Sequence, residues 1–147
     1  MNKVDENKLV VAEGDIRRQA VDVLKQNGLP TSDIDADKML FALLKNGSIV
    51  GTGGLEYFDN CALLRSVSVT LTCRGNGLGK FITKELEKYC MQRAIGTVYL
   101  LTTTARGFFV KQGYRVIDRE RAPQCIKDTA EFSSLCPSSA ILMKKNL

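Results

Sequence analysis

A glycine-rich turn, Arg74-Gly75-Asn76-Gly77-Leu78-Gly79, lies between an apolar stretch and a periodic one. The β-branched and aliphatic residues 63–70 before it predict a strand, and the apolar spacing of three and four after it predicts a helix. The first N–H groups of a helix lack partners within it, and the helix dipole places positive charge there. Glycine lets a ligand approach the backbone, and arginine adds a fixed charge. The pattern therefore predicts a phosphate site, although an ordinary turn before a helix looks the same.

Two common nucleotide motifs are excluded at this turn. No Gly-Lys-Ser/Thr follows the spacer that a Walker loop requires, and Gly75-x-Gly77-x-Gly79 lacks the G-x-G-x-x-G spacing of dinucleotide sites. A nucleotide-binding domain of another kind stays the weaker alternative.

Two motifs instead resemble one family. Arg74-x-x-Gly77-x-Gly79 after a strand resembles the acetyl-CoA pyrophosphate motif, R/Q-x-x-G-x-G/A, of the GNAT (GCN5-related N-acetyltransferase) superfamily. The later Ala105-x-x-Phe108-Phe109-x-Lys111-x-Gly113-Tyr114 is similar to its A-x-x-F-Y-x-K-x-G-F/Y segment. The resemblance covers residues 8–145. It implies an enzyme that transfers an acetyl group from acetyl-CoA, its co-substrate, to an amine.

The resemblance also implies which residues hold acetyl-CoA. In the family, the strand before the turn pairs its backbone with the pantetheine arm, which corresponds here to Val67, Ser68 and Val69. A backbone N–H near Val67 would take the thioester carbonyl as the oxyanion develops. The pyrophosphate would lie on the N–H groups of Arg74, Gly75, Asn76, Gly77, Leu78, Gly79 and Lys80.

Glu56 is the candidate general base. A free amine is protonated at neutral pH and must lose a proton before it attacks. Glu56 follows the Asn46-Gly47 hairpin turn on a strand beside the central one, where it would act directly or through water; the alternative is a solvent-facing glutamate. No general acid is assigned, because the position of the family's usual tyrosine is occupied by Phe109 here. Tyr114 is expected to be structural.

Arg65 is the candidate acceptor-binding residue. It alternates with Val67 and Val69 and so is expected on their face of the strand. An arginine in an apolar strand needs a partner, which is either a substrate carboxylate or an internal carboxylate such as Glu56. Other side chains expected to line the same pocket are Thr102, Thr103 and Ser133.

Finer resemblances suggest an acceptor class. Leu64-Arg65-Ser66-Val67 looks like amino-acid N-acetyltransferases that act on glutamate, and segments 100–104 and 129–140 are similar to a GNAT subfamily associated with arsenic-resistance operons. They imply a small, carboxylate-bearing amine and a role in arsenic or xenobiotic detoxification. The alternatives are a protein or peptide N-acetyltransferase and a non-catalytic acyl-CoA sensor, which the missing tyrosine favours.

The elements that must position these residues predict an α+β fold. Strands are expected at 8–13, 38–45, 48–58, 63–70, 97–102, 114–118 and 140–144, helices at 16–26, 78–90, 105–112 and 123–132, and loops at 29–37 and 133–139. Apolar periodicity leaves 38–45 open between strand and helix, and the hairpin turn after it favours strand. The 78–90 helix carries Lys80, Lys84, Glu87 and Lys88 on the face opposite its apolar residues. The resemblance implies a mostly antiparallel sheet of six to seven strands with helices on both faces, splayed between the strands at about 63–70 and 97–102.

Composition and charge narrow the possible domain number, location, partners and kinds of site. The 147 residues fit one domain, 1–147, and 44% hydrophobic with 25% charged residues is ordinary for a soluble protein. A polar start and no long apolar run predict a cytoplasmic protein with no membrane partner. The charge of +5 is scattered, so no nucleic acid is expected, and a homodimer is left open. Five cysteines without C-x-x-C, and no histidine, argue against a disulfide framework, a metal site and histidine-based catalysis.

Overall fold

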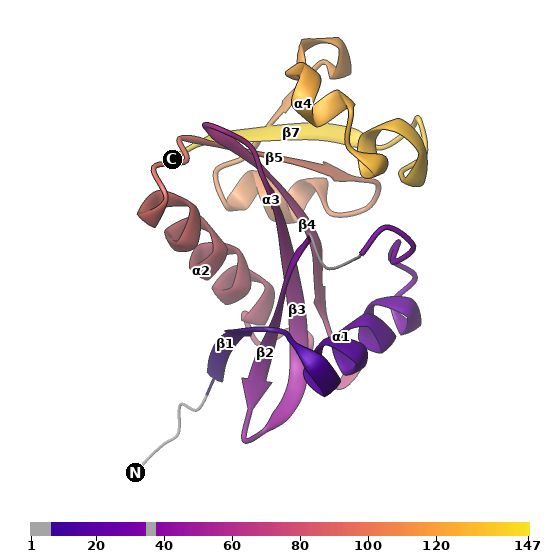
Figure 1. The fold of residues 1–147 in the computed structure, drawn as a ribbon, viewed down its shortest axis with the longest axis vertical. Coiled ribbons are helices and arrows are strands. Elements are labelled where there is room, and N and C mark those ends of the chain that lie inside the picture. Colours follow the sequence, from indigo (N-terminus) through magenta and orange to yellow (C-terminus); the bar gives the residue numbers. More distant parts are fainter. Residues whose placement is uncertain (1–6, 35–37) are drawn as a thin grey trace. The chain divides into compact units, whose positions relative to one another are not determined.

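The computed structural model describes residues 7–34 and 38–147 (Figure 1). Seven strands form a sheet in the order β1-β2-β3-β4-β5-β7-β6. The β1–β2, β2–β3, β5–β7 and β6–β7 registers are antiparallel, and the β4–β5 register is parallel. The predicted α+β class with a mostly antiparallel sheet is therefore confirmed.

The bounds of the elements follow the sequence prediction closely in most places. The strands are β1 Asn7–Val11, β2 Met39–Lys45, β3 Ser48–Tyr57, β4 Cys61–Val69, β5 Thr97–Thr102, β6 Arg115–Ile117 and β7 Ile141–Asn146. The helices are α1 Gly14–Gln26, α2 Leu78–Gln92, α3 Arg106–Lys111 and α4 Gln124–Lys127, with short turns η1 Leu71–Cys73, η2 Arg119–Arg121 and η3 Glu131–Leu135. Part of the predicted 29–37 loop, residues 35–37, lies outside the described residues.

The chain forms two compact units. The first comprises the chain up to Leu55 together with Ser66–Leu86, and the second comprises Glu56–Arg65 and Glu87–Leu147. Strands β3 and β4 and helix α2 each contribute to both. The expectation of one acetyltransferase domain over 1–147 stays a prediction.

In the first unit, α1 and the start of α2 cover opposite faces of the sheet. Ala20 and Leu24 of α1 pack into one core with Leu40 and Ala42 of β2. Ala42 pairs with Thr52, so the neighbouring Gly51 and Gly53 face the other way. A Cβ on Gly51 would lie 2.7 Å from Ile82 Cδ1, and one on Gly53 would lie 2.6 Å from Leu86 Cδ1. The β3 glycines therefore allow α2 to approach the sheet closely.

In the second unit, the core forms where β4 begins. Cys61, Leu63, Tyr99, Ile126 and Leu142 are buried together there with Ala122. The parallel ladder joins Cys61–Leu63 to Thr97–Tyr99, while β5 goes on pairing with β7 as far as Thr102. Both strands of the parallel pair therefore continue past the end of their ladder, as the predicted splay requires.

The predicted 123–132 helix is wrong. Helix α4 ends at Lys127, and a separate π-helical turn, η3, follows at Glu131–Leu135, so the predicted 133–139 loop begins inside that turn. Thr129 explains the break: its hydroxyl donates to the Ile126 carbonyl (2.7 Å) and accepts from the Phe132 N–H (3.2 Å). A threonine that bonds to backbone groups in this way competes with the regular helical ladder.

No helix in the described part of the chain has the length and apolar character needed to cross a membrane.

Candidate active site

The glycine-rich turn of the first unit adopts a backbone conformation that favours glycine. Gly75 and Gly77 have φ values of +85° and +77°. A Cβ added at either position would meet nothing within 4 Å, so the constraint lies in the backbone and not in crowding. The Asn76 side chain donates to the Cys73 carbonyl (3.1 Å) and thereby ties the turn to the end of η1.

Helix α2 begins directly after this turn. The Phe81 N–H makes the first backbone hydrogen bond of this helix, donating to the Gly77 carbonyl (3.1 Å). The N–H groups of Leu78, Gly79 and Lys80 precede that bond, at the positive end of a helix of 15 residues. These donors, beside glycines with no side chain, fit a phosphate group.

Arg74 is held at the same turn by two contacts. Its Nε donates to the Val69 carbonyl and its Nη2 donates to Asn27 Oδ1, both at 3.0 Å. Among the described residues, these bonds leave the Nη1 amino group available to a ligand. A cavity of about 410 Å³ adjoins it, lined by Val23, Gln26, Asn27, Thr70, Leu71 and Arg74. Asn27 was not predicted at this site, because in the sequence it is simply the residue that ends α1.

The strand before the turn is irregular at Ser66, whose φ of +59° is rare for a residue other than glycine. The Thr52 hydroxyl donates to the Ser66 carbonyl (2.8 Å) and shares a 2.6 Å hydrogen bond with the Ser68 hydroxyl. In a regular strand, successive side chains point to opposite faces of the sheet, and a residue with such a φ value interrupts this alternation. The predicted shared face for Arg65 and Val67 therefore loses its basis.

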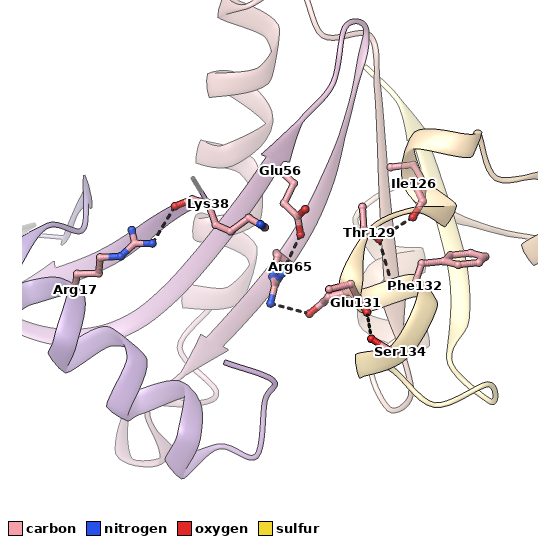
Figure 2. A network of polar contacts seen from close by, with 10 residues as sticks. Arg17, Lys38, Glu56, Arg65, Ile126, Thr129, Glu131, Phe132 and Ser134 are labelled. Carbon is pink, nitrogen blue, oxygen red and sulfur yellow. Dashed lines mark hydrogen bonds and ion pairs between the residues drawn. The ribbon is translucent and has the colours of Figure 1, made fainter. Parts of the chain in front are cut away.

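In the second unit, Arg65 lies between two carboxylates (Figure 2). Its Nη1 is 2.9 Å from Glu56 Oε2, and its Nη2 is 3.3 Å from Glu131 Oε2. The three side chains are 2%, 10% and 6% exposed, respectively. Of the two partners that the sequence left open for Arg65, the internal carboxylate Glu56 is thus present. Glu131 was not anticipated, because it was expected on a regular helix.

The backbone around Glu131 is fixed by its own contacts. The Glu131 carbonyl accepts from the Cys136 N–H (2.9 Å), which closes the π-helical turn. Arg119 donates to the carbonyls of Ala140 (3.0 Å) and Phe132 (3.2 Å), and its guanidinium lies 4.4 Å from the Phe132 ring centre. The turn therefore holds a carboxylate against Arg65 with little freedom of its own.

Two aromatic residues of the late motif, Phe109 and Tyr114, have structural surroundings. Phe109 is buried and packs edge to face against Tyr114, and it has no proton to donate. The Tyr114 hydroxyl donates to Glu87 Oε2 (2.9 Å), whose other oxygen is 2.9 Å from Lys145 Nζ. Burial, followed by the nearby Glu87 charge, raises the pKa of Tyr114 above its usual range. Tyr114 is thus structural, as expected, whereas Glu87 is buried although the sequence places it on the polar face of α2.

The other predicted acceptor-binding residues are Thr102, Thr103 and Ser133. The Thr102 hydroxyl accepts from the Ala105 N–H (2.9 Å) where β5 leads into α3. Thr103 and Ser133 are exposed. Their contact with an acceptor stays a prediction.

The fold and the turn together define a class of protein. The sequence model described as the Acetyltransferase (GNAT) family matches residues 12–114, and the chain belongs to that family. Both motifs that suggested the family lie within this range, so the predicted membership is confirmed.

Particular relatives are distant in sequence. An uncharacterized N-acetyltransferase of Chlorobaculum tepidum is 27% identical over 103 residues, 69% of this chain and 66% of the relative. N-acetylglutamate synthase from Neisseria gonorrhoeae, complexed with coenzyme A and N-acetyl-glutamate, superposes with a TM-score of 0.82 at 14% identity. That match covers 99% of this chain and 36% of the synthase. The ribosomal-protein-S18-alanine N-acetyltransferase from Escherichia coli has a TM-score of 0.73 at 16% identity, covering 95% and 93%. At such identities the structures share a fold alone.

Proposed function

We propose that this protein is an acetyl-CoA-dependent N-acetyltransferase that acts on a small amine. The observation that carries the proposal is the turn from Arg74 to Lys80, whose positive-φ glycines and open helix N-terminus suit a pyrophosphate within a GNAT family match. When bound, acetyl-CoA supplies the activated acetyl thioester.

Three parts of the first unit would hold acetyl-CoA. The N–H groups of Leu78–Lys80 and the Arg74 side chain bind the pyrophosphate, and the backbone of Val67–Val69 pairs with the pantetheine arm. The Val67 N–H stabilises the developing oxyanion. The end of the parallel β4–β5 ladder at Leu63 supports this assignment, since β4 continues beyond it to Val69.

Glu56 removes a proton from the acceptor, directly or through water, and the neutral amine then attacks the thioester. Arg65 positions the Glu56 carboxylate through their 2.9 Å contact, and Glu131 holds Arg65 from the other side. Holding the amine and the thioester together supplies much of the acceleration. The leaving thiolate takes its proton from the amine or from water, because Phe109 replaces the family's tyrosine.

The acceptor class rests on resemblance. A carboxylate-bearing amino acid is favoured by the likeness of residues 64–67 to glutamate acetyltransferases, and an amino-acid-like organoarsenical belongs to the same class. Arg65 already pairs with two carboxylates, so we assign it first to Glu56 and only second to a substrate. A cytoplasmic location and a homodimer stay predictions.

A non-catalytic acyl-CoA sensor is the second candidate function. The observation that favours it is Phe109, which is buried and has no acidic proton. If the protein is an enzyme, the alternative to a small-molecule acceptor is a protein or peptide acceptor.

The test is thiol release from acetyl-CoA with amino acids, glutamate analogues, polyamines and peptides as acceptors. We expect turnover with a small amine, and a larger kcat/KM for glutamate than for its side-chain amide if the carboxylate preference holds. Binding of acetyl-CoA without turnover across the panel would favour the sensor, and activity with peptides alone would favour a protein acceptor. A nucleoside triphosphate that outcompetes acetyl-CoA would overturn the proposal.

A further inference from the structure

Two cysteines that are far apart in the sequence meet in the core of the second unit. Cys61 Sγ and Cys125 Sγ are 3.7 Å apart although 64 positions separate them. Cys61 is the first residue of β4 and is buried, whereas Cys125 lies in α4 and is half-buried. Both thiols are free. No C-x-x-C spacing marks this pair, so it could not be predicted from the sequence.

The distance makes a bond between the two sulfurs accessible. A disulfide has an S–S length of about 2.0 Å, so the sulfurs must approach by roughly 1.7 Å. Rotation of the two short side chains with a small backbone shift covers a movement of this size. Cys61 is buried in one hydrophobic cluster with Leu63, Ile126 and Leu142, and Cys125 packs against that cluster.

We propose that Cys61 and Cys125 form an oxidisable thiol pair that peroxide converts to an intramolecular disulfide. The inference rests on the two thiols alone and does not depend on the proposed acetyltransferase activity. The bond would join the start of the strand that carries Arg65 to the helix that leads towards Glu131.

The reaction begins at the more accessible sulfur. Hydrogen peroxide oxidises the Cys125 thiol to a sulfenic acid and is itself reduced to water. The Cys61 sulfur then attacks the sulfenic sulfur, the S–S bond forms, and the hydroxyl leaves with the Cys61 proton as a second water. Burial, followed by the adjacent Cys125 thiol, raises the pKa of Cys61 to about 12. Cys61 is therefore not the thiol that peroxide oxidises first, and its resolving role rests on the 3.7 Å between its sulfur and that of Cys125.

The test is peroxide treatment of a Cys73→Ser/Cys136→Ser variant, which keeps both thiols of the pair and the buried Cys90. Before alkylation, we expect a mass loss of about 2 Da relative to the reduced protein. After alkylation under denaturing conditions, the oxidised protein should carry two alkyl groups fewer than the reduced protein and yield a linked peptide pair containing Cys61 and Cys125. Dithiothreitol should reverse these changes. The bond should also raise the thermal midpoint by roughly 5–10 °C, because it closes a long loop in the unfolded chain.

The controls separate the pair from general oxidation. On the same background, Cys125→Ser should abolish the link, whereas Cys90→Ser should keep it. Cys61→Ser should trap the Cys125 sulfenic acid for dimedone labelling, and Cys125→Ser carries the test alone if Cys61→Ser fails to fold. Full alkylation of both thiols after a peroxide dose that oxidises Cys73 in the wild-type protein would overturn the proposal. A link that persists in Cys125→Ser would also overturn it.

Discussion

Replacement of Arg65 by methionine should destabilise the protein strongly. The side chains of Glu56 and Glu131 are 10% and 6% exposed, and both lie within 3.3 Å of the guanidinium. Arg65→Met leaves two buried carboxylates without that shared cation. Removing one partner of a buried ion pair costs about 3–5 kcal/mol, which corresponds to a fall of roughly 10 °C in the thermal midpoint for a chain of this size.

The assay is urea unfolding followed by circular dichroism, with two control proteins. Arg18→Met removes an arginine from a pair with Asp15 whose side chains are 75% and 76% exposed, and should cost less than about 1 kcal/mol. The triple variant Arg65→Met/Glu56→Gln/Glu131→Gln removes the buried charges together and should recover most of the loss. The reasoning is refuted if Arg65→Met costs no more than Arg18→Met, or if the triple variant is no more stable than Arg65→Met.

Three further predictions address the base, the buried tyrosine and the turn. Glu56→Gln should lower kcat by about 100-fold or more with acetyl-CoA affinity unchanged, and steady-state kinetics that show an intact kcat would exclude Glu56 as the base. Tyr114 has a raised pKa in the folded protein, so its contribution to stability is present below about pH 10 and is lost above it at roughly 1.4 kcal/mol per pH unit. Tyr114→Phe should therefore unfold with a weaker alkaline dependence in urea titrations from about pH 8 to 11, and identical pH slopes would contradict this. Gly77→Ala should cost about 1 kcal/mol because of its positive φ, whereas Gly107→Ala, inside α3 with open space around its Cβ, should be neutral or stabilising; equal unfolding free energies for the two variants would contradict the assignment.

The parts of the site that the sequence predicted are local ones. The strand, the glycines and the start of α2 are neighbours along the chain, so residue types and spacing suffice to describe the turn around Gly77. The close approach of α2 to β3 was also predictable, because glycines at alternate strand positions mark a backbone that another element must approach.

The parts that the sequence could not predict depend on tertiary contacts. Asn27 reaches Arg74 across 47 positions, and Glu87 reaches Lys145 across 58. Helical periodicity places Glu87 beside exposed lysines, but a lysine and a tyrosine from elsewhere in the chain satisfy its carboxylate, and it is buried. Glu131 was missed because Thr129 breaks the expected helix and turns that carboxylate towards Arg65.

Binding of acetyl-CoA at the turn before α2 is the central claim, and calorimetric titration of an Arg74→Gln variant tests it most directly. Charge-assisted hydrogen bonds are worth about 1.5–3 kcal/mol, so acetyl-CoA should bind this variant roughly 10- to 100-fold more weakly than wild type. Acetyl-pantetheine, which lacks the pyrophosphate, should bind both proteins equally, and Arg18→Gln should bind acetyl-CoA like wild type. An unchanged Kd for acetyl-CoA in Arg74→Gln, or an equal loss for acetyl-pantetheine, would contradict the account.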